Sequence, residues 1–262
     1  MLIRAITALV GIGGIIATWV LFKETGLLAL AALVSLVTCI EFSMLLEKGH
    51  SVMRVFFVFV CYSFYLAFTF FSQSFLVFLI CFLLVAAYFI LFSKDNISAR
   101  MVKLASWMMG IIYCGSLPGT VSLGVLKFGA KFFTALLILS FGTDTFAYLG
   151  GRLLGRTPLA PDISPNKTLE GSFIGLVGGS ALGFYYLYQN HFAKNLALLA
   201  VCCVLTSIAT QLGDLFESMI KRYSGVKDSG KMMPGHGGVL DRIDGLLFAA
   251  PILFMWLLYF QG

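Results

Sequence analysis

Acidic residues gather in the second half of the chain, where their spacing allows them to act together. Eight of the 12 Asp and Glu residues fall between positions 144 and 244. Asp214 and Glu217 are three residues apart, as are Asp241 and Asp244, so each pair can lie on one face of a helix. Carboxylates within or beside apolar segments are costly, and a group of them indicates a site.

Carboxylate oxygens are ligands that Mg²⁺ takes in proteins, usually together with substrate phosphates. We therefore predict a Mg²⁺ site here, to which a second cation could be added. The predicted ligands are Asp214, Asp241, Asp244 and, as a fourth, Asp144. Two alternatives stay open. The aspartates at 241 and 244 could form salt bridges with Arg242 or Lys221, and Asp144 could be a polar group of helix packing.

Between positions 218 and 244 the chain combines cations with glycines. The cations Lys221, Arg222, Lys227 and Arg242 are more than an interfacial anchor needs, and they suit a polyphosphate. Glycines on both sides of His236 allow the backbone to approach a ligand closely. The predicted substrate contacts are Ser218, Arg222, Lys227, Asp228, His236, Gly237 and Gly238. The predicted catalytic residues are Asp214, Asp241, Asp244, Lys221 and Arg242.

A second polar loop covers residues 151–170 and leads into an apolar segment. Ser164, Lys167 and Thr168 come just before the expected helix, where backbone N–H groups and the helix dipole favour a phosphate. We predict that all three contact substrate. The same residues also fit an ordinary helix start, with Thr168 as N-cap and Glu170 in the first turn; both interpretations can hold.

The elements that position these loops are membrane-spanning helices. The chain is 60% hydrophobic and only 11% charged, whereas a soluble domain carries about a quarter charged residues. A spanning helix needs about 20 apolar residues. We therefore predict an all-α integral membrane protein with about nine transmembrane helices, at 3–22, 26–46, 52–72, 75–93, 104–124, 129–150, 171–189, 195–214 and 243–260.

The distribution of Lys and Arg predicts the orientation. Nine spans put 14 of the 18 basic residues on one side, as expected for the cytoplasmic side. The N-terminus and both polar loops are then cytoplasmic, and the polar active site faces the cytoplasm from the cell (inner) membrane. The net charge of +6 follows from this topology and from attraction to anionic membrane lipids, so no nucleic-acid partner is expected.

The polar residues also suggest how the chain is organised. Residues 1–125 are expected to be mainly scaffold, with roles in lipid access or contacts of a homodimer. Residues 126–262 are expected to form the catalytic region, with cytoplasmic loops at 151–170 and 222–242. Glu41, alone in its apolar segment, is expected to pair with a basic residue. Residues 258–262 have the composition of a tag remnant.

The segment from Ser218 to Asp244 resembles the signature of phosphatidate cytidylyltransferases, also called CDP-diacylglycerol synthases. That signature reads S-x-apolar-K-R-x₄-K-D-x-small-x₂-apolar-small-x-H-G-G-apolar-x-D-R-apolar-D, and every fixed position is met. The stretch 164–171 is similar to a second recurrent stretch of the family, with Asn166 where lysine is expected. The resemblance that carries motifs covers residues 142–245.

The resemblance implies Mg²⁺-dependent transfer of CMP from CTP to phosphatidic acid, with CDP-diacylglycerol and pyrophosphate as products. An oxygen of phosphatidate would attack the α-phosphorus of CTP. Two alternatives remain at this point. A CTP-dependent lipid kinase has related chemistry, and a polytopic transporter would also carry acids within spans, although transporters usually show paired broken helices in two related halves.

Overall fold

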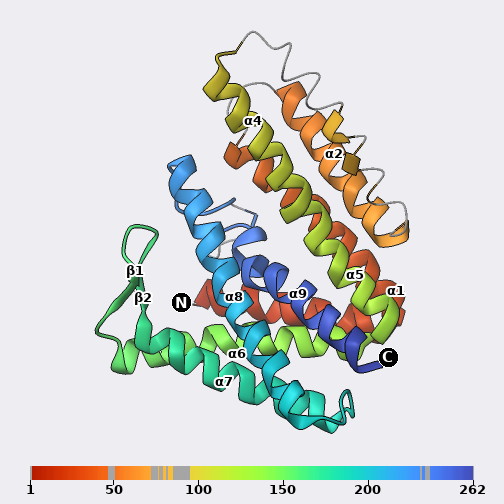
Figure 1. The fold of residues 1–262 in the computed structure, drawn as a ribbon, viewed down its shortest axis with the longest axis vertical. Helices are drawn as coiled ribbons and strands as arrows, with labels where there is room; N and C mark the ends of the chain where they lie inside the picture. The colour runs from red at the N-terminus through yellow and green to blue at the C-terminus, as the bar shows by residue number, and fades with distance from the viewer. Residues whose placement is uncertain are drawn as a thin grey trace.

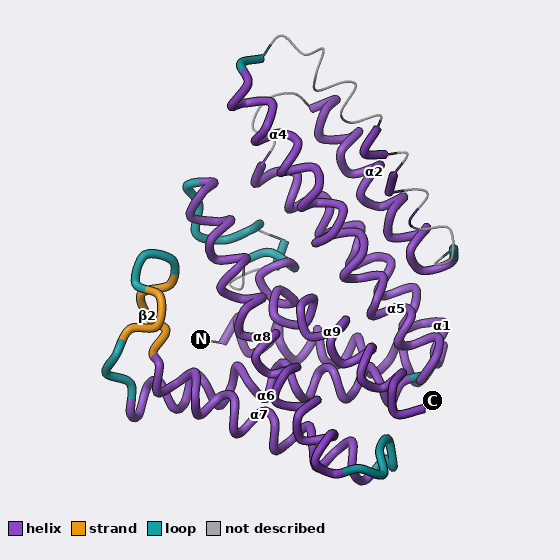
Figure 2. Tube along the Cα trace, viewed as in Figure 1, coloured by secondary structure: helices purple, strands orange, loops and turns teal. Residues whose placement is uncertain are grey.

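The computed structural model describes residues 2–46, 51–71, 76, 79–80, 82–84, 95–230, 232–233 and 237–261. Within them the chain is helical except for one short hairpin and the loops that connect the elements (Figures 1 and 2). The elements are α1 (Leu2–Leu46), α2 (Ser51–Phe70), α4 (Ile97–Gly110), η2 (Ile111–Ser116), α5 (Leu117–Phe128), α6 (Ala130–Leu154), β1 (Pro158–Ala160), β2 (Ser164–Thr168), α7 (Leu169–Gln189), α8 (Leu196–Ser224) and α9 (Leu240–Gln261).

The all-α membrane class is confirmed, but the count of nine spans is not. Six helices of the described part are long and apolar enough to cross a membrane: Gly13–Leu46, Val52–Phe70, Ile97–Phe128, Ala130–Leu154, Leu196–Ser224 and Leu240–Phe260. The protein is therefore a multi-pass membrane protein.

The differences from the predicted spans have local causes. The first two predicted spans, 3–22 and 26–46, both fall within α1 and are separated by its kink at Lys23, where φ is 51° and ψ is −134° (Figure 1). The fourth, 75–93, lies largely outside the described residues. The seventh, 171–189, is helical as α7, although it is not among the six.

The fifth predicted span is a continuous helical stretch that changes its winding near Pro118. Proline has no N–H group, so the carbonyl of Cys114 loses its usual helical donor. The hydroxyl of Ser35 on α1 donates to that carbonyl instead, at 3.0 Å. The N–H of Leu117 reaches back to Ile112, and the segment η2 is consequently a π-helix.

Helices α8 and α9 take part in two buried apolar clusters. One cluster joins α1, α2 and η2 to Ile220, Leu240 and Leu247. The other joins α5 and α6 to residues of α7, α8 and α9. Helices α8 and α9 contribute to both, so the N-terminal helices pack directly against the helices that carry the motif.

Helices α6 and α7 pack closely through a stripe of glycines (Figure 1). The stripe repeats every four residues, at Gly171, Gly175, Gly179 and Gly183, and all four are buried. A Cβ atom at Gly179 would lie 2.7 Å from the backbone N and Cα of Thr143. Small residues at this spacing let two membrane helices approach backbone to backbone, which places Thr143 of α6 against the middle of α7, at Gly175 and Gly179.

The stripe predicts the effect of Gly179→Ala. Alanine favours a helix over glycine by about 1 kcal/mol, but the added methyl would press on the backbone of α6, which cannot turn aside. Overpacking of this kind costs about 1–3 kcal/mol, so we expect a lower melting temperature in detergent. The matched control is Gly13→Ala, where nothing lies within 4 Å of the added atom. Equal melting temperatures for the two variants would contradict this close packing.

Candidate functional site

Helices α8 and α9 cross at two glycines, next to two of the predicted site residues. A Cβ atom at Gly213 would lie 2.5 Å from the carbonyl oxygen of Asp244, and one at Gly245 would lie 2.9 Å from the carbonyl oxygen of Thr210. The two backbones are therefore in contact. Asp214 and Asp244 follow and precede these glycines in the sequence, so the crossing brings them together.

Four acids meet around this crossing. Asp244 is 8% exposed and interacts electrostatically with Asp214, Glu217 and Asp144. Asp144, from α6, interacts in turn with Asp214 and with Lys167. We call Asp144, Asp214, Glu217 and Asp244 the acid cluster. Electrostatic interactions thus link three of the four predicted metal ligands, and their role in holding a metal stays a prediction.

The hairpin of β1 and β2 carries a lysine to the acid cluster. Its strands are antiparallel, with Pro158 opposite Thr168, and they project from the helices (Figure 2). The Nζ of Lys167, on β2, lies 2.5 Å from an Oδ2 oxygen of Asp214. Ser164, at the other end of β2, is half-buried.

The base of the hairpin is held at the start of α7. Thr168 is the N-cap and accepts from the N–H of Gly171 at 3.2 Å, so this prediction is confirmed. Glu170 accepts from the N–H of Arg156 at 3.0 Å and from the hydroxyl of Thr157 at 2.9 Å. The N–H of Arg156 is the largest cause that lowers the pKa of Glu170 to about 2, so Glu170 is ionised at neutral pH.

Arg222 connects the hairpin to α8. Its Nε donates to the carbonyl oxygen of Ile163 at 3.1 Å, while the side chain stays exposed. The contact fixes the turn between the two strands next to the end of α8. Arg222 therefore has one structural partner here, and its predicted contact with substrate stays a prediction.

Lys221 lies between two acids in the interior. It forms ion pairs with Glu217, one helical turn earlier, and with Asp241, whose Oδ1 is 2.6 Å from its Nζ. The side chains of Lys221, Glu217 and Asp241 are 12%, 0% and 7% exposed. The salt bridge of Asp241 with Lys221, left open by the sequence, is present.

The other oxygen of Asp241 holds the motif loop. Oδ2 accepts from the N–H of Ser229 at 2.9 Å, from its hydroxyl at 3.0 Å and from the N–H of Gly238 at 2.7 Å. Gly237 has φ of 85°, and a Cβ atom there would lie 2.5 Å from the same oxygen. Gly237 and Gly238 thus make room for a carboxylate of the protein itself. Whether Asp241 also binds a metal stays a prediction.

Glu41 of α1 is a site residue that the sequence interpretation missed. It is 4% exposed and accepts from the N–H groups of Val239 and Leu240, at 3.0 and 2.8 Å, and from the hydroxyl of Ser229 at 3.2 Å. These contacts cap the N-terminus of α9. Within the part of the chain that the structure describes, its partners are these backbone and hydroxyl donors and not the basic residue that we expected. The signal was its position as an isolated acid in an apolar span.

The remaining predicted residues lie around this loop. Lys227 and Asp228 are exposed, Arg242 is exposed in the first turn of α9, and Ser218 is buried on α8. His236 lies outside the described residues.

The acid cluster fits Mg²⁺ in its chemistry. Its donors are carboxylate oxygens, the ligands of a hard cation, and like charges close together gain from a cation between them. Within the described residues, no three His, Cys, Asp or Glu side chains converge as a complete metal site. Mg²⁺ is commonly held by one or two carboxylates, with waters and substrate phosphates completing its shell, so this arrangement is compatible with it.

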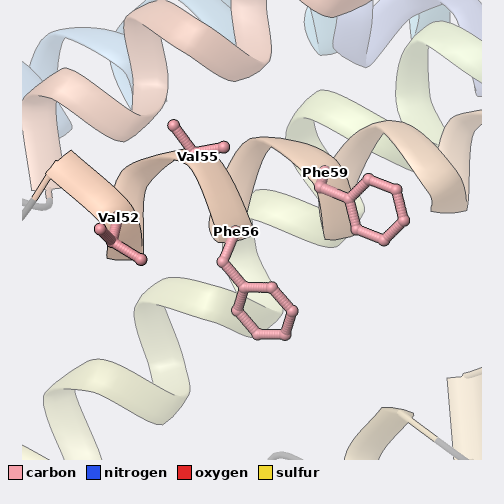
Figure 3. A pocket seen from close by; sticks show the side chains of 4 residues that line it. All are labelled: Val52, Val55, Phe56 and Phe59. Carbon is pink, nitrogen blue, oxygen red and sulfur yellow. The ribbon is translucent and has the colours of Figure 1, made fainter.

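A hollow of about 440 Å³ on α2 is apolar, in contrast to the acid cluster (Figure 3). It is lined by Val52, Val55, Phe56 and Phe59. These side chains offer neither charge nor hydrogen bonds, so the hollow cannot bind phosphate groups.

Comparison with known proteins agrees with the motif. The model of the cytidylyltransferase family matches residues 2–260. Phosphatidate cytidylyltransferases of Staphylococcus haemolyticus and Helicobacter pylori are 39% and 46% identical over 176 and 138 residues, which are 65% and 52% of this chain and 66% and 51% of those proteins.

A plant protein is similar over a comparable stretch. Phosphatidate cytidylyltransferase 4, chloroplastic, of Arabidopsis thaliana is 38% identical over 185 residues, which are 61% of this chain and 47% of that protein. The chain thus spans about half to two thirds of the length of these relatives. Because the family model covers nearly all of its residues, the chain belongs to the cytidylyltransferase family.

Proposed function

We propose that this chain transfers CMP from CTP to phosphatidic acid and releases pyrophosphate. Membership of the family and the names of the similar proteins support this activity. The observation that carries it is the meeting of α6, α8, α9 and the hairpin at the acid cluster, with Lys167 against Asp214. Acids beside cations at one end of a membrane helix pair suit a polyphosphate that arrives with a divalent cation.

In this proposal Asp214 and Asp244 hold Mg²⁺. When bound, the ion would offset the negative charge of the phosphate groups. Asp144 interacts with Asp214, and in this proposal it orients Asp214 or is a further ligand of Mg²⁺. Asp241 positions the loop through its four hydrogen bonds.

The chain's own contribution is to bring two anions together. A phosphatidate oxygen forms a bond to the α-phosphorus of CTP, and the bond between that phosphorus and the oxygen bridging to the β-phosphorus breaks. A phosphate monoester is already a competent nucleophile, so the barrier lies in charge repulsion and positioning, which fixed cations lower. The exposed cations Lys227 and Arg242 and the ion-paired Lys167 are placed to do this.

We also propose that the site faces the cytoplasm. With nine spans, 14 of the 18 Lys and Arg residues would share the side that carries the hairpin and the motif loop, as the positive-inside rule expects. CTP is then bound from the aqueous side, while phosphatidate enters from the inner membrane.

Removal of one carboxylate charge tests the acid cluster. We expect Asp214→Asn and Asp244→Asn each to lower CTP- and phosphatidate-dependent pyrophosphate release at least about a hundredfold, because a lost charge contact in the transition state costs this much. The melting temperature should be retained, since an amide has the shape of the carboxylate. Asp162→Asn, in the exposed hairpin turn, is the control. Near-normal turnover in either cluster variant would contradict the assignment.

Replacement of two lysines of the motif should affect different properties, the stability of the fold for Lys221 and the binding of CTP for Lys227. Lys221→Met leaves Glu217 and Asp241 buried without their cation, so we expect a loss of about 3–5 kcal/mol of unfolding free energy. Lys227→Met, on an exposed side chain, should keep the melting temperature and raise the KM for CTP. Thermal unfolding and steady-state kinetics separate the two. An unaltered KM after Lys227→Met would remove this lysine from the substrate site.

Glu41→Gln tests whether an N-terminal helix positions the motif loop. Glutamine keeps the size but loses the charge, and its NH₂ group would face the N–H donors of Val239 and Leu240. We expect a lower melting temperature and about tenfold slower turnover, because charge-assisted hydrogen bonds of this kind contribute about 1.5–3 kcal/mol each. Glu24→Gln, at an exposed position of α1, should change neither value. Wild-type turnover in Glu41→Gln would show that the loop holds its shape without α1.

A further inference from the structure

Tyr113 is a buried tyrosine whose hydroxyl is left without a hydrogen bond. The residue is 1% exposed, and among the described residues its hydroxyl has no hydrogen-bond partner. A buried polar group without a partner costs free energy, and phenylalanine would fill the same space without that cost. Such an atom in a close-packed interior calls for an explanation.

The ring of Tyr113 is packed against the helices that carry the acid cluster. It makes edge contacts with Phe216 of α8 and Phe248 of α9, with ring centroids 5.3 and 6.0 Å apart. Phe216 immediately precedes Glu217, and Phe248 lies one turn after Asp244. The tyrosine thus packs against both helices, beside residues close in sequence to the cluster.

The hydroxyl lies within the electrostatic field of the cluster. Its strongest interaction with an ionised group is with Asp244, followed by Glu217, and it also interacts with Asp214. These acids come from two helices, α8 and α9, the same two helices whose phenylalanines contact the ring of Tyr113.

The backbone around Tyr113 is irregular in a way that is frequent at functional sites. Tyr113 belongs to the π-helical segment η2. A π-helical turn changes the direction in which a side chain leaves the helix, and such turns occur often at binding and catalytic positions. Here the turn follows from Pro118 and is stabilised by Ser35.

Two features therefore meet: a cluster of four acids of which two, Asp214 and Glu217, are ion-paired with lysines, and a buried hydroxyl without a hydrogen-bond partner among the described residues. A single ligand completes both if it brings a cation with bound oxygen atoms. We propose that Tyr113 contacts the ligand of the acid cluster and hydrogen-bonds to an oxygen of it, either a water on a divalent cation or a phosphate oxygen of CTP. This inference rests on the proposed function and adds a residue from the expected scaffold region to the site.

The test compares Tyr113→Phe with Tyr65→Phe by thermal unfolding of the full chain in detergent. Tyr65 is also buried, at 2% exposure, but its hydroxyl shares a hydrogen bond with that of Ser122 at 2.8 Å. Each variant is measured without ligand, with Mg²⁺ alone, and with Mg²⁺ and CTP. Ligand that binds the folded state raises the melting temperature according to its affinity.

The two variants should respond in opposite ways. Tyr113→Phe should keep or raise the ligand-free melting temperature, because an unpaired hydroxyl is removed, and its ligand-induced rise should correspond to about tenfold weaker binding. Tyr65→Phe should lower the ligand-free melting temperature and leave the ligand-induced rise unchanged.

Comparing Mg²⁺ alone with Mg²⁺ and CTP identifies the oxygen that Tyr113 contacts and shows which result would contradict each proposal. A smaller rise with Mg²⁺ alone assigns a water on the cation, and a smaller rise only with CTP assigns a phosphate oxygen; both support the inference. A rise in Tyr113→Phe equal to that of the wild type overturns it. No rise in the wild-type protein with either ligand overturns the proposed function, and the inference with it.

Discussion

Asp241 accepts four hydrogen bonds, from Lys221, from two donors of Ser229 and from the N–H of Gly238. In a low-dielectric interior such contacts are strong, and an unpaired member of the network is costly. The loop before α9 therefore wraps around this carboxylate on one side and around Glu41 on the other. A Cβ atom at Gly230 or Gly238 would lie 2.6 or 2.5 Å from a carboxylate oxygen of Glu41, so the glycines of the motif are needed by the fold.

The position of the loop depends in turn on how closely the helices approach. Lipid gives apolar helices little reason to associate, so packing of small residues decides which faces meet. Gly213 and Gly245 bring α8 against α9, and the glycine stripe of α7 brings it against Thr143 of α6. Each crossing lies beside an acid of the cluster. The same contacts that hold the helices together thus set the spacing of the carboxylates.

The sequence alone predicted the membrane class and the cap at Thr168. These follow from composition, helical spacing and local start signals, which are short-range properties. The partners of Glu41 and the inward position of Lys221 could not be read in this way, because both depend on contacts between helices distant in the chain. The count of nine spans is not confirmed, because the fourth predicted span lies largely outside the described residues and α7 is not among the six long apolar helices. The glycine stripe of α7 was not predicted, although its spacing of four residues is a local pattern that the sequence contains.

The cations of the motif differ in burial, and this separates fold from binding. Lys221 is 12% exposed between two acids, so exchanging its partners would leave buried charges unpaired. Lys167 is 27% exposed and its partner Asp214 32%, a setting in which an ion pair contributes little and can be exchanged at small cost. Lys227 is fully on the surface of the loop. A phosphate-bearing ligand can therefore recruit the outer cations while the inner ones keep the loop in place, so one short segment can stabilise the fold and also bind substrate.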